Sequence, residues 1–88
     1  MSGKSDDRRD IVHGLAAKLV AARNTSGLSQ TAAATASAVS RPNLSRYESG
    51  SKTPTLAVLI RLAAAYSVPV ADLLPPPVVA PRVVSKRK

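Results

Sequence analysis

The chain has 88 residues and no cysteine, which suits one small domain and excludes disulfides and cysteine-based metal sites. Thirteen basic residues against five acidic ones give a net charge of +8, which favours a polyanionic partner. No apolar run approaches the roughly 18 residues of a membrane span, and the first ten residues are too polar for a signal peptide, so we expect a soluble cytoplasmic protein.

Capping residues and apolar spacing predict five helices. Residues 1–9 are expected to be a charged, disordered lead-in. The first helix is predicted to begin at its cap Asp10 and to end before Gly27. Its apolar residues recur at four-residue spacing: Ile11, Leu15 and Leu19. Gly14 within this helix leaves room for another element to pack closely.

The second and third predicted helices are short and adjacent. Ser29 caps the second, residues 30–37, whose sequence QTAAATAS contains no large apolar side chain. Residues 38–40 form a turn, and Ser40 at its end caps the third helix, residues 41–49. Two capped helices separated by a three-residue turn are typical of a helix-turn-helix.

The last elements close the predicted domain. Thr55 caps a fourth helix whose apolar residues follow a helical period: Leu56, Leu59, Ile60 and Ala63. Pro69 opens a short fifth helix that is expected to bury three residues: Val70, Leu73 and Leu74. The segment PPPVVAPRVVSKRK, with four basic residues and no acid, predicts a flexible, extended tail over 75–88. The predicted all-α domain therefore spans 10–74.

The third helix has two unlike faces. Leu44, Tyr47 and Glu48 share a side that can enter a core. The other side carries short or basic residues: Arg41 at the tip, Pro42, Ser45, Arg46 and Ser49. Such a face suits the major groove of DNA, where arginine contacts to guanine are the commonest specific contacts. A merely solvated basic face is the alternative for this helix taken alone.

Several segments together resemble the Cro and phage-repressor type of helix-turn-helix regulators, also called the xenobiotic-response-element type. They are GLSQ at 27–30, VSRPNLSRYESG at 39–50, TPTL at 53–56 and VPVADLL at 68–74. The resemblance covers about 15–74. It implies a compact five-helix, lambda-repressor-like domain that binds double-stranded DNA, usually as a dimer, and regulates transcription.

The resemblance also implies roles for individual residues. Four are expected to face base edges: Arg41, Pro42, Ser45 and Arg46. Five are expected near DNA phosphates: Ser29, Gln30, Ser40, Asn43 and Lys52. Glu48 is implied to pair with Arg23, because a buried carboxylate needs a partner, and this pair would hold the first helix against the third.

Three small residues depart from the family pattern: Ala33, Ser37 and Ala38. The family usually has leucine at the first position, often a larger residue at the second and glycine at the third. Ala38 must adopt a left-handed conformation at a cost of about 1 kcal/mol, or the turn differs. The second helix is therefore expected to pack closer or less firmly than in relatives.

The sequence favours a repressor that binds DNA as a homodimer through residues 56–74. The tail either extends this contact by paired strands at 78–84 or is disordered and adds only unspecific attraction to DNA. One alternative is an antitoxin-like regulator whose tail masks a partner protein, and another is an unspecific nucleoid-coating protein. We expect no cofactor and no metal, since His13 stands alone. We also expect no enzymatic activity, since the serines and threonines lack a supporting base and acid.

Overall fold

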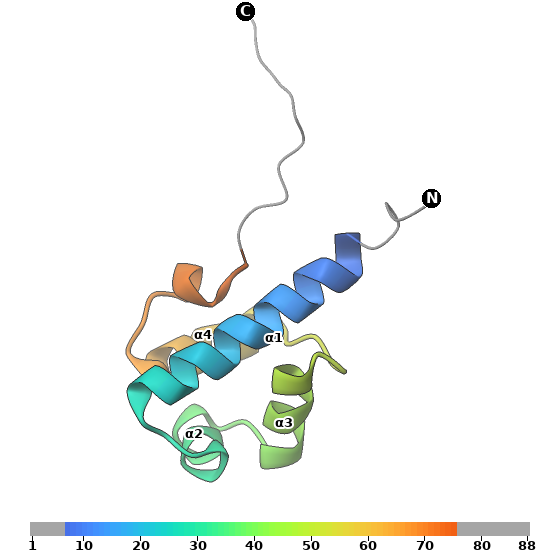
Figure 1. The fold of residues 1–88 in the computed structure, drawn as a ribbon. Helices are drawn as coiled ribbons and strands as arrows, with labels where there is room; N and C mark the ends of the chain where they lie inside the picture. Colours follow the sequence, from blue (N-terminus) through green and yellow to red (C-terminus); the bar gives the residue numbers. More distant parts are fainter. Residues whose placement is uncertain (1–6, 76–88) are drawn as a thin grey trace, which may run out of the picture.

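The computed structural model describes residues 7–75, which form four α-helices and one short 3₁₀ helix (Figure 1). In chain order these are α1 Asp7–Ser26, α2 Gln30–Ser37, α3 Arg41–Ser49, α4 Leu56–Tyr66 and the 3₁₀ helix η2 Val70–Leu73. No strand occurs among these residues. The long helix α1 lies between η2 on one side and α3 on the other (Figure 1). The expected all-α class is confirmed.

Hydroxyl caps fix where three helices begin. Each cap oxygen accepts a hydrogen bond from a backbone N–H three residues later: Ser29 from Ala32 at 3.0 Å, Ser40 from Asn43 at 3.3 Å and Thr55 from Val58 at 3.1 Å. The predicted starts of α2, α3 and α4 are therefore confirmed. Gly27 and Gly50 end the preceding helices with φ of 77° and 81°, as expected.

The turn between α2 and α3 has the left-handed residue that the resemblance implies, but this residue is an alanine. Ala38 adopts φ 58° and ψ 36°, the left-handed conformation that disfavours side chains. Its N–H and that of Val39 donate to carbonyls of α2, which satisfies the end of that helix. The expected left-handed conformation is therefore present, and the strain falls on Ala38.

The first helix begins earlier than predicted. α1 starts at Asp7, so the interpretation of Asp10 as the cap was wrong, and Asp10 lies within the first turns of α1. Acidic residues near a helix start complement the helix dipole, which lets the helix continue through this charged segment. At Gly14 an added Cβ would lie 2.9 Å from the Pro75 side chain, so the expected close packing there is confirmed.

The predicted fifth helix is a 3₁₀ turn. Leu73 is fully buried, but Leu74 is 44% exposed with an extended ψ of 143°, so the expectation that Leu74 is buried was wrong. The reason is local: a residue that precedes a proline is driven out of the helical conformation, and Pro75 follows. The predictions for 1–6, for most of the tail and for strands at 78–84 lie outside the described residues.

Four fully buried leucines bring the elements together in one core: Leu19 of α1, Leu44 of α3, Leu62 of α4 and Leu73 of η2. The buried face of α4 includes only part of the predicted apolar series. It consists of Leu59, Leu62, Ala63 and Tyr66. Leu56 and Ile60, which follow the same helical period as Leu59 and Ala63, are 65% and 51% exposed. Because α4 is apolar on nearly every side, its spacing alone did not define one face.

Candidate nucleic-acid interface

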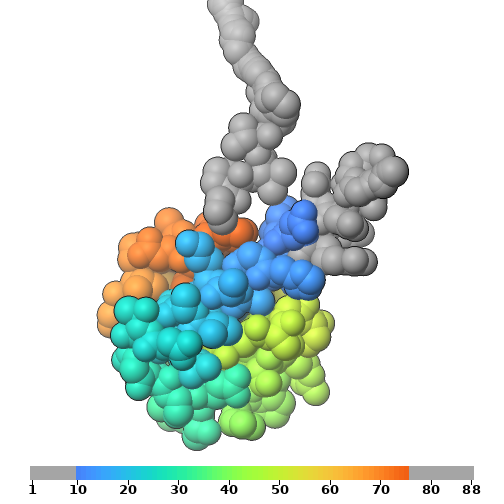
Figure 2. All heavy atoms as spheres, viewed as in Figure 1, coloured from blue at the N-terminus to red at the C-terminus, as the bar shows by residue number. Residues whose placement is uncertain are grey.

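The outer side of α3 is uncovered and basic. Leu44 and Tyr47 are buried, whereas the four residues expected to face bases are all exposed: Arg41, Pro42, Ser45 and Arg46. In the space-filling view α3 and the loop after it form one flank of the molecule (Figure 2). The structure therefore brings these four residues together on a surface that a DNA groove can approach.

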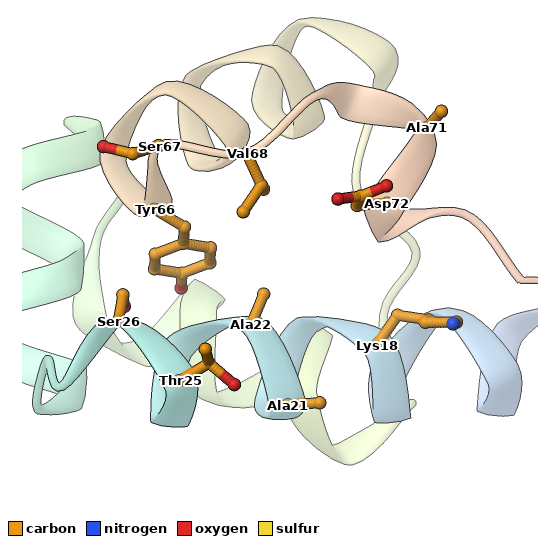
Figure 3. Close-up of a pocket in the computed structure, with 10 residues that line it drawn as sticks. All are labelled: Lys18, Ala21, Ala22, Thr25, Ser26, Tyr66, Ser67, Val68, Ala71 and Asp72. Atoms are coloured by element: carbon orange, nitrogen blue, oxygen red, sulfur yellow. The ribbon is translucent and has the colours of Figure 1, made fainter.

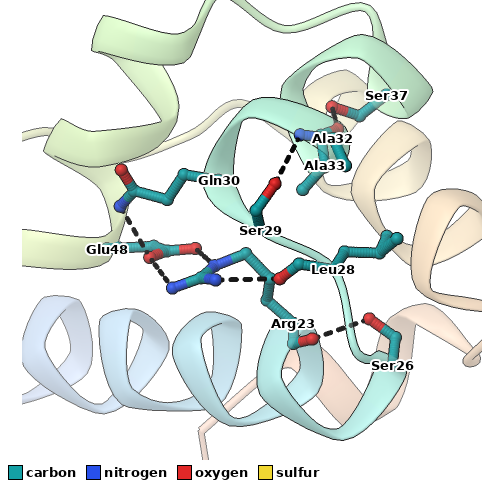
Figure 4. A network of polar contacts seen from close by, with 9 residues as sticks. All are labelled: Arg23, Ser26, Leu28, Ser29, Gln30, Ala32, Ala33, Ser37 and Glu48. Atoms are coloured by element: carbon teal, nitrogen blue, oxygen red, sulfur yellow. Dashed lines mark hydrogen bonds and ion pairs between the residues drawn. The ribbon is translucent and has the colours of Figure 1, made fainter.

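A charged network behind α3 joins three helices (Figure 4). Arg23 of α1 donates to Glu48 of α3 through Nε at 2.7 Å and through Nη2 at 3.1 Å. Its Nη1 donates to the carbonyl of Leu28 at 2.9 Å. Gln30 of α2 donates to the same carboxylate at 3.0 Å. The hydrogen bond with Glu48 raises the pKa of the Arg23 guanidinium above its ordinary value.

In the free protein, the side chains of Glu48 and Gln30 are both engaged by this network. The Glu48 side chain is only 5% exposed, and it is the single acidic residue between Gly27 and Ser67. Its charge is satisfied internally, so the outer side of α3 keeps its positive charge. The Gln30 amide points inward to Glu48 (Figure 4), so in the free protein this amide is engaged by the network.

The remaining residues expected near phosphates lie at the starts of α2 and α3 and in the loop after α3. Ser29 and Ser40 are exposed, and their hydroxyls are used as helix caps. Asn43 accepts hydrogen bonds from Arg46 Nη1 at 3.3 Å and from Lys52 Nζ at 3.2 Å. The structure thus places Lys52, from the loop after α3, beside Asn43, which also contacts Arg46.

One contact at the helix-turn-helix was missed by the sequence reasoning. Arg61 of α4 donates from Nε to the carbonyl of Ser37, the last residue of α2, at 3.1 Å. The Ser37 hydroxyl is buried and donates to the Ala33 carbonyl at 2.7 Å. Arg61 and Ser37 are 24 residues apart, and no local spacing signals their contact.

A pocket of about 600 Å³ lies away from α3, between α1, the end of α4 and η2 (Figure 3). Its walls include small residues such as Ala21, Ala22 and Ala71, with Lys18 and Asp72 toward one end. The Tyr66 hydroxyl is buried without a hydrogen-bond partner, and burial raises the pKa of Tyr66 to about 12. Nothing here resembles the basic surface on α3.

Two further features bear on function. Within residues 7–75, no group of three or more histidine and acidic side chains is placed to hold a metal ion. In the same part of the chain, no helix is both long and apolar enough to cross a membrane.

Comparisons with known proteins agree with this geometry. A family model described as "Helix-turn-helix domain" matches residues 14–75. Among solved structures, the chain is similar to the restriction-modification controller protein C.AhdI from Aeromonas hydrophila, with a TM-score of 0.70 and 27% sequence identity. That match covers 75% of this chain and 98% of the other. No curated protein sequence matches.

The family model spans more than half of the chain, and its limits enclose α2, the turn, α3 and the network behind them. The expected resemblance to Cro and phage-repressor-type regulators is therefore confirmed. The chain belongs to the helix-turn-helix domain family, and it is a DNA-binding regulator.

Proposed function

We propose that the protein is a sequence-specific transcriptional repressor that binds a two-fold operator as a homodimer, with α3 in the major groove. One observation supports the reading of base sequence by α3. Exposed Arg41 and Arg46 flank the small exposed Ser45, while Glu48, the single acidic residue between Gly27 and Ser67, is bound internally by Arg23. Arginine beside small residues allows close approach and bidentate contacts to guanine. In the proposed mechanism, the bound dimer covers a promoter and thereby blocks transcription.

Phosphate contacts are proposed at both ends of this face. The first two backbone N–H groups of α2 and the N–H of Arg41 in α3 precede the N–H groups that the capping serines engage, whereas Pro42 has no N–H, and helix starts attract anions. Lys52 lies beside α3 and adds a cation. In this proposal, these groups fix the register of the protein on DNA, and the arginines read the sequence.

The test begins with duplexes that the protein retains from a randomised pool. Arg46→Ala and Arg41→Ala are each expected to weaken binding to a selected duplex by about 1–3 kcal/mol and to relax preference at one base pair. Lys18→Ala is the matched control, because it removes the same charge from the pocket side of α1. Equal losses on selected and scrambled duplexes would contradict base reading by the arginines.

The dimer proposal rests on α4. This helix has one charged residue in eleven, and its exposed side is largely apolar: Leu56, Ala57, Ile60 and Ala64. Leu74, next to η2, adds a further exposed leucine. A helix that is apolar all round is normally covered, and one recognition helix alone reads too few base pairs for useful specificity. A second copy seated here would supply the second α3, with half-sites about 34–36 Å apart.

Ile60→Lys tests this interface, with Ala17→Lys on the exposed side of α1 as the charge-matched control. We expect light scattering to show a dimer for the wild type and the control and a monomer for Ile60→Lys. The variant should lose binding to a two-half-site duplex but keep single-half-site binding. A monomeric wild type, or a dimer that survives Ile60→Lys, would contradict the proposal. Stable copurification of a different protein would favour the partner-binding alternative.

A further inference from the structure

Asn43 lies where two cations of the DNA-facing surface meet. It is the third residue of α3, and Arg46 follows one turn later on the same side. The single oxygen Oδ1 of Asn43 accepts from Arg46 Nη1 at 3.3 Å and from Lys52 Nζ at 3.2 Å. One neutral oxygen therefore links a side chain proposed to read a base with one proposed to bind phosphate.

Lys52 is held at this place by its backbone as well. After Gly50 the chain folds back on α3, and the N–H groups of Ser51 and Lys52 both donate to the Arg46 carbonyl, at 3.0 and 3.3 Å. The Lys52 ammonium also lies 5.8 Å from the centre of the Tyr47 ring, which favours a cation at that position. The loop thus delivers Lys52 to Asn43 across nine residues of sequence.

The choice of an amide at position 43 fits the charge of this surface. Two cations on one acceptor repel each other, and the only acid of this region, Glu48, is committed to Arg23 and Gln30. An amide oxygen offsets that repulsion without cancelling a positive charge. An aspartate would hold the same two groups but would also repel DNA phosphates.

We propose that Asn43 is a positioning residue that holds Arg46 and Lys52 ready for DNA, and is not itself a phosphate ligand. The inference rests on the proposed function, in which these two side chains contact DNA. Ordering a long side chain before binding removes an entropy cost, which corresponds to a gain in affinity of about two- to tenfold for each side chain held.

A mutant cycle tests the coupling. Affinity for a selected duplex is measured at low salt for the wild type, Asn43→Ala, the double variant Arg46→Ala/Lys52→Ala and the triple variant. We expect Asn43→Ala to weaken binding about three- to tenfold in the wild type and less than about twofold when both cations are already absent. An equal loss in the two backgrounds would show that Asn43 contacts DNA itself, which would overturn the proposal.

The same mutant cycle distinguishes a failure of the Asn43 positioning role from a failure of the proposed DNA contacts of Arg46 and Lys52. If Arg46→Ala/Lys52→Ala binds as the wild type does, the proposed DNA contacts fail, whatever Asn43 does. If the double variant loses affinity but Asn43→Ala has no effect in the wild type, the DNA contacts stand and the positioning role is wrong.

Asn43→Asp provides a second readout that a merely structural role would not move. This variant keeps the shared acceptor but adds a negative charge. We expect the magnitude of the slope of log affinity against log salt to fall by about 0.9, because the added charge cancels one phosphate contact. The ratio of affinities for selected and scrambled duplexes should stay the same. Asn43→Ala should show the reverse: an unchanged slope and reduced discrimination. Loss of discrimination in Asn43→Asp, or its retention in Asn43→Ala, would overturn the proposal.

Discussion

α2 and α4 pack against each other, yet they are built from opposite kinds of residue. α2 has the sequence QTAAATAS, and its buried residues are small: Ala33, Ala34 and Ser37. α4 has the sequence LAVLIRLAAAY, buries large side chains such as Leu62, and still leaves Leu56 and Ile60 exposed. One helix has too little apolar surface to anchor itself, and the other has more than the core of one chain can cover.

The difference shows two ways of fixing a helix in a small domain. α2 is held at its ends by polar contacts from other helices: Gln30 to Glu48 at its start and Arg61 to the Ser37 carbonyl at its end. These contacts set the position of the α2 start, which is proposed to face phosphate. α4 is held by apolar burial, and its surplus is available to a second copy of the chain.

The largest effect is expected at the network that anchors α2. Glu48→Ala leaves the largely buried Arg23 charge without its carboxylate and removes the acceptor of Gln30, so we expect a loss of about 3–5 kcal/mol in the free energy of unfolding. Chemical denaturation measures this loss. Asp72→Ala, which removes an exposed carboxylate of η2, is the control and should change stability by less than about 0.5 kcal/mol. A near-native Glu48→Ala protein would mean that α2 is not held by this network.

The next effect tests whether small residues in α2 are required by close packing. Ala33 is fully buried at a position where relatives usually have leucine. Ala33→Leu should destabilise the fold by about 1–3 kcal/mol, because three more carbons at a fully buried position must displace the residues packed around it. Ala32→Leu on the exposed side of α2 is the control and should be nearly neutral. A stabilised Ala33→Leu variant would show that the core around α2 has unfilled space. Close packing would then not explain why α2 buries small residues where α4 buries large ones.

The sequence predicted the parts of the fold that local chemistry decides. Serine and threonine caps and helix-ending glycines act within three or four residues, so the bounds of α2 and α3 were readable. The buried face of α4 was not, because Leu56 and Ile60 satisfy a helical period as well as Leu59 does. Burial there depends on which elements pack against the helix, which is a tertiary property.

Some features of the candidate site were likewise predictable from local sequence, and others were not. The two faces of α3 follow from helical geometry, and the Arg23–Glu48 contact was reached only through the family resemblance. The contacts of Arg61 with Ser37 and of Lys52 with Asn43 join residues on different elements. Their geometry depends on how α4 and the loop after α3 fold back, so no spacing in the sequence could indicate them.

A smaller effect is expected at Tyr66 of α4, whose hydroxyl is buried. The Tyr66 hydroxyl has no partner, so Tyr66→Phe should raise the free energy of unfolding by about 1 kcal/mol. Burial raises the pKa of Tyr66 to about 12, from 10 when unfolded, so the unfolded chain loses this proton first. Stability should therefore fall between about pH 10 and pH 12, and Tyr66→Phe should fall less steeply over that range. Identical pH profiles of thermal unfolding would contradict this account of Tyr66.

The smallest effect is expected at the end of α2. The left-handed conformation of Ala38 costs about 1 kcal/mol, and glycine avoids this strain but makes the unfolded chain more flexible. Ala38→Gly should therefore stabilise by about 0.5 kcal/mol, measured by chemical denaturation. Ala36→Gly, within the exposed side of α2, should destabilise by about 0.5–1 kcal/mol. Changes of the same sign in both variants would show that Ala38 is not strained.

The central claim is that the side formed by α2 and α3 meets DNA, while the pocket side of α1 does not. Backbone amide chemical shifts of isotope-labelled protein, followed as a selected duplex is added, test it most directly. We expect the largest changes at residues 29–31, at Lys52, and in α3 at Arg41 and residues 43–46, since Pro42 has no amide proton. Amides of residues 18–22 and of η2 should change least. Large changes along 18–22 and η2, with residues 41–46 unmoved, would contradict it.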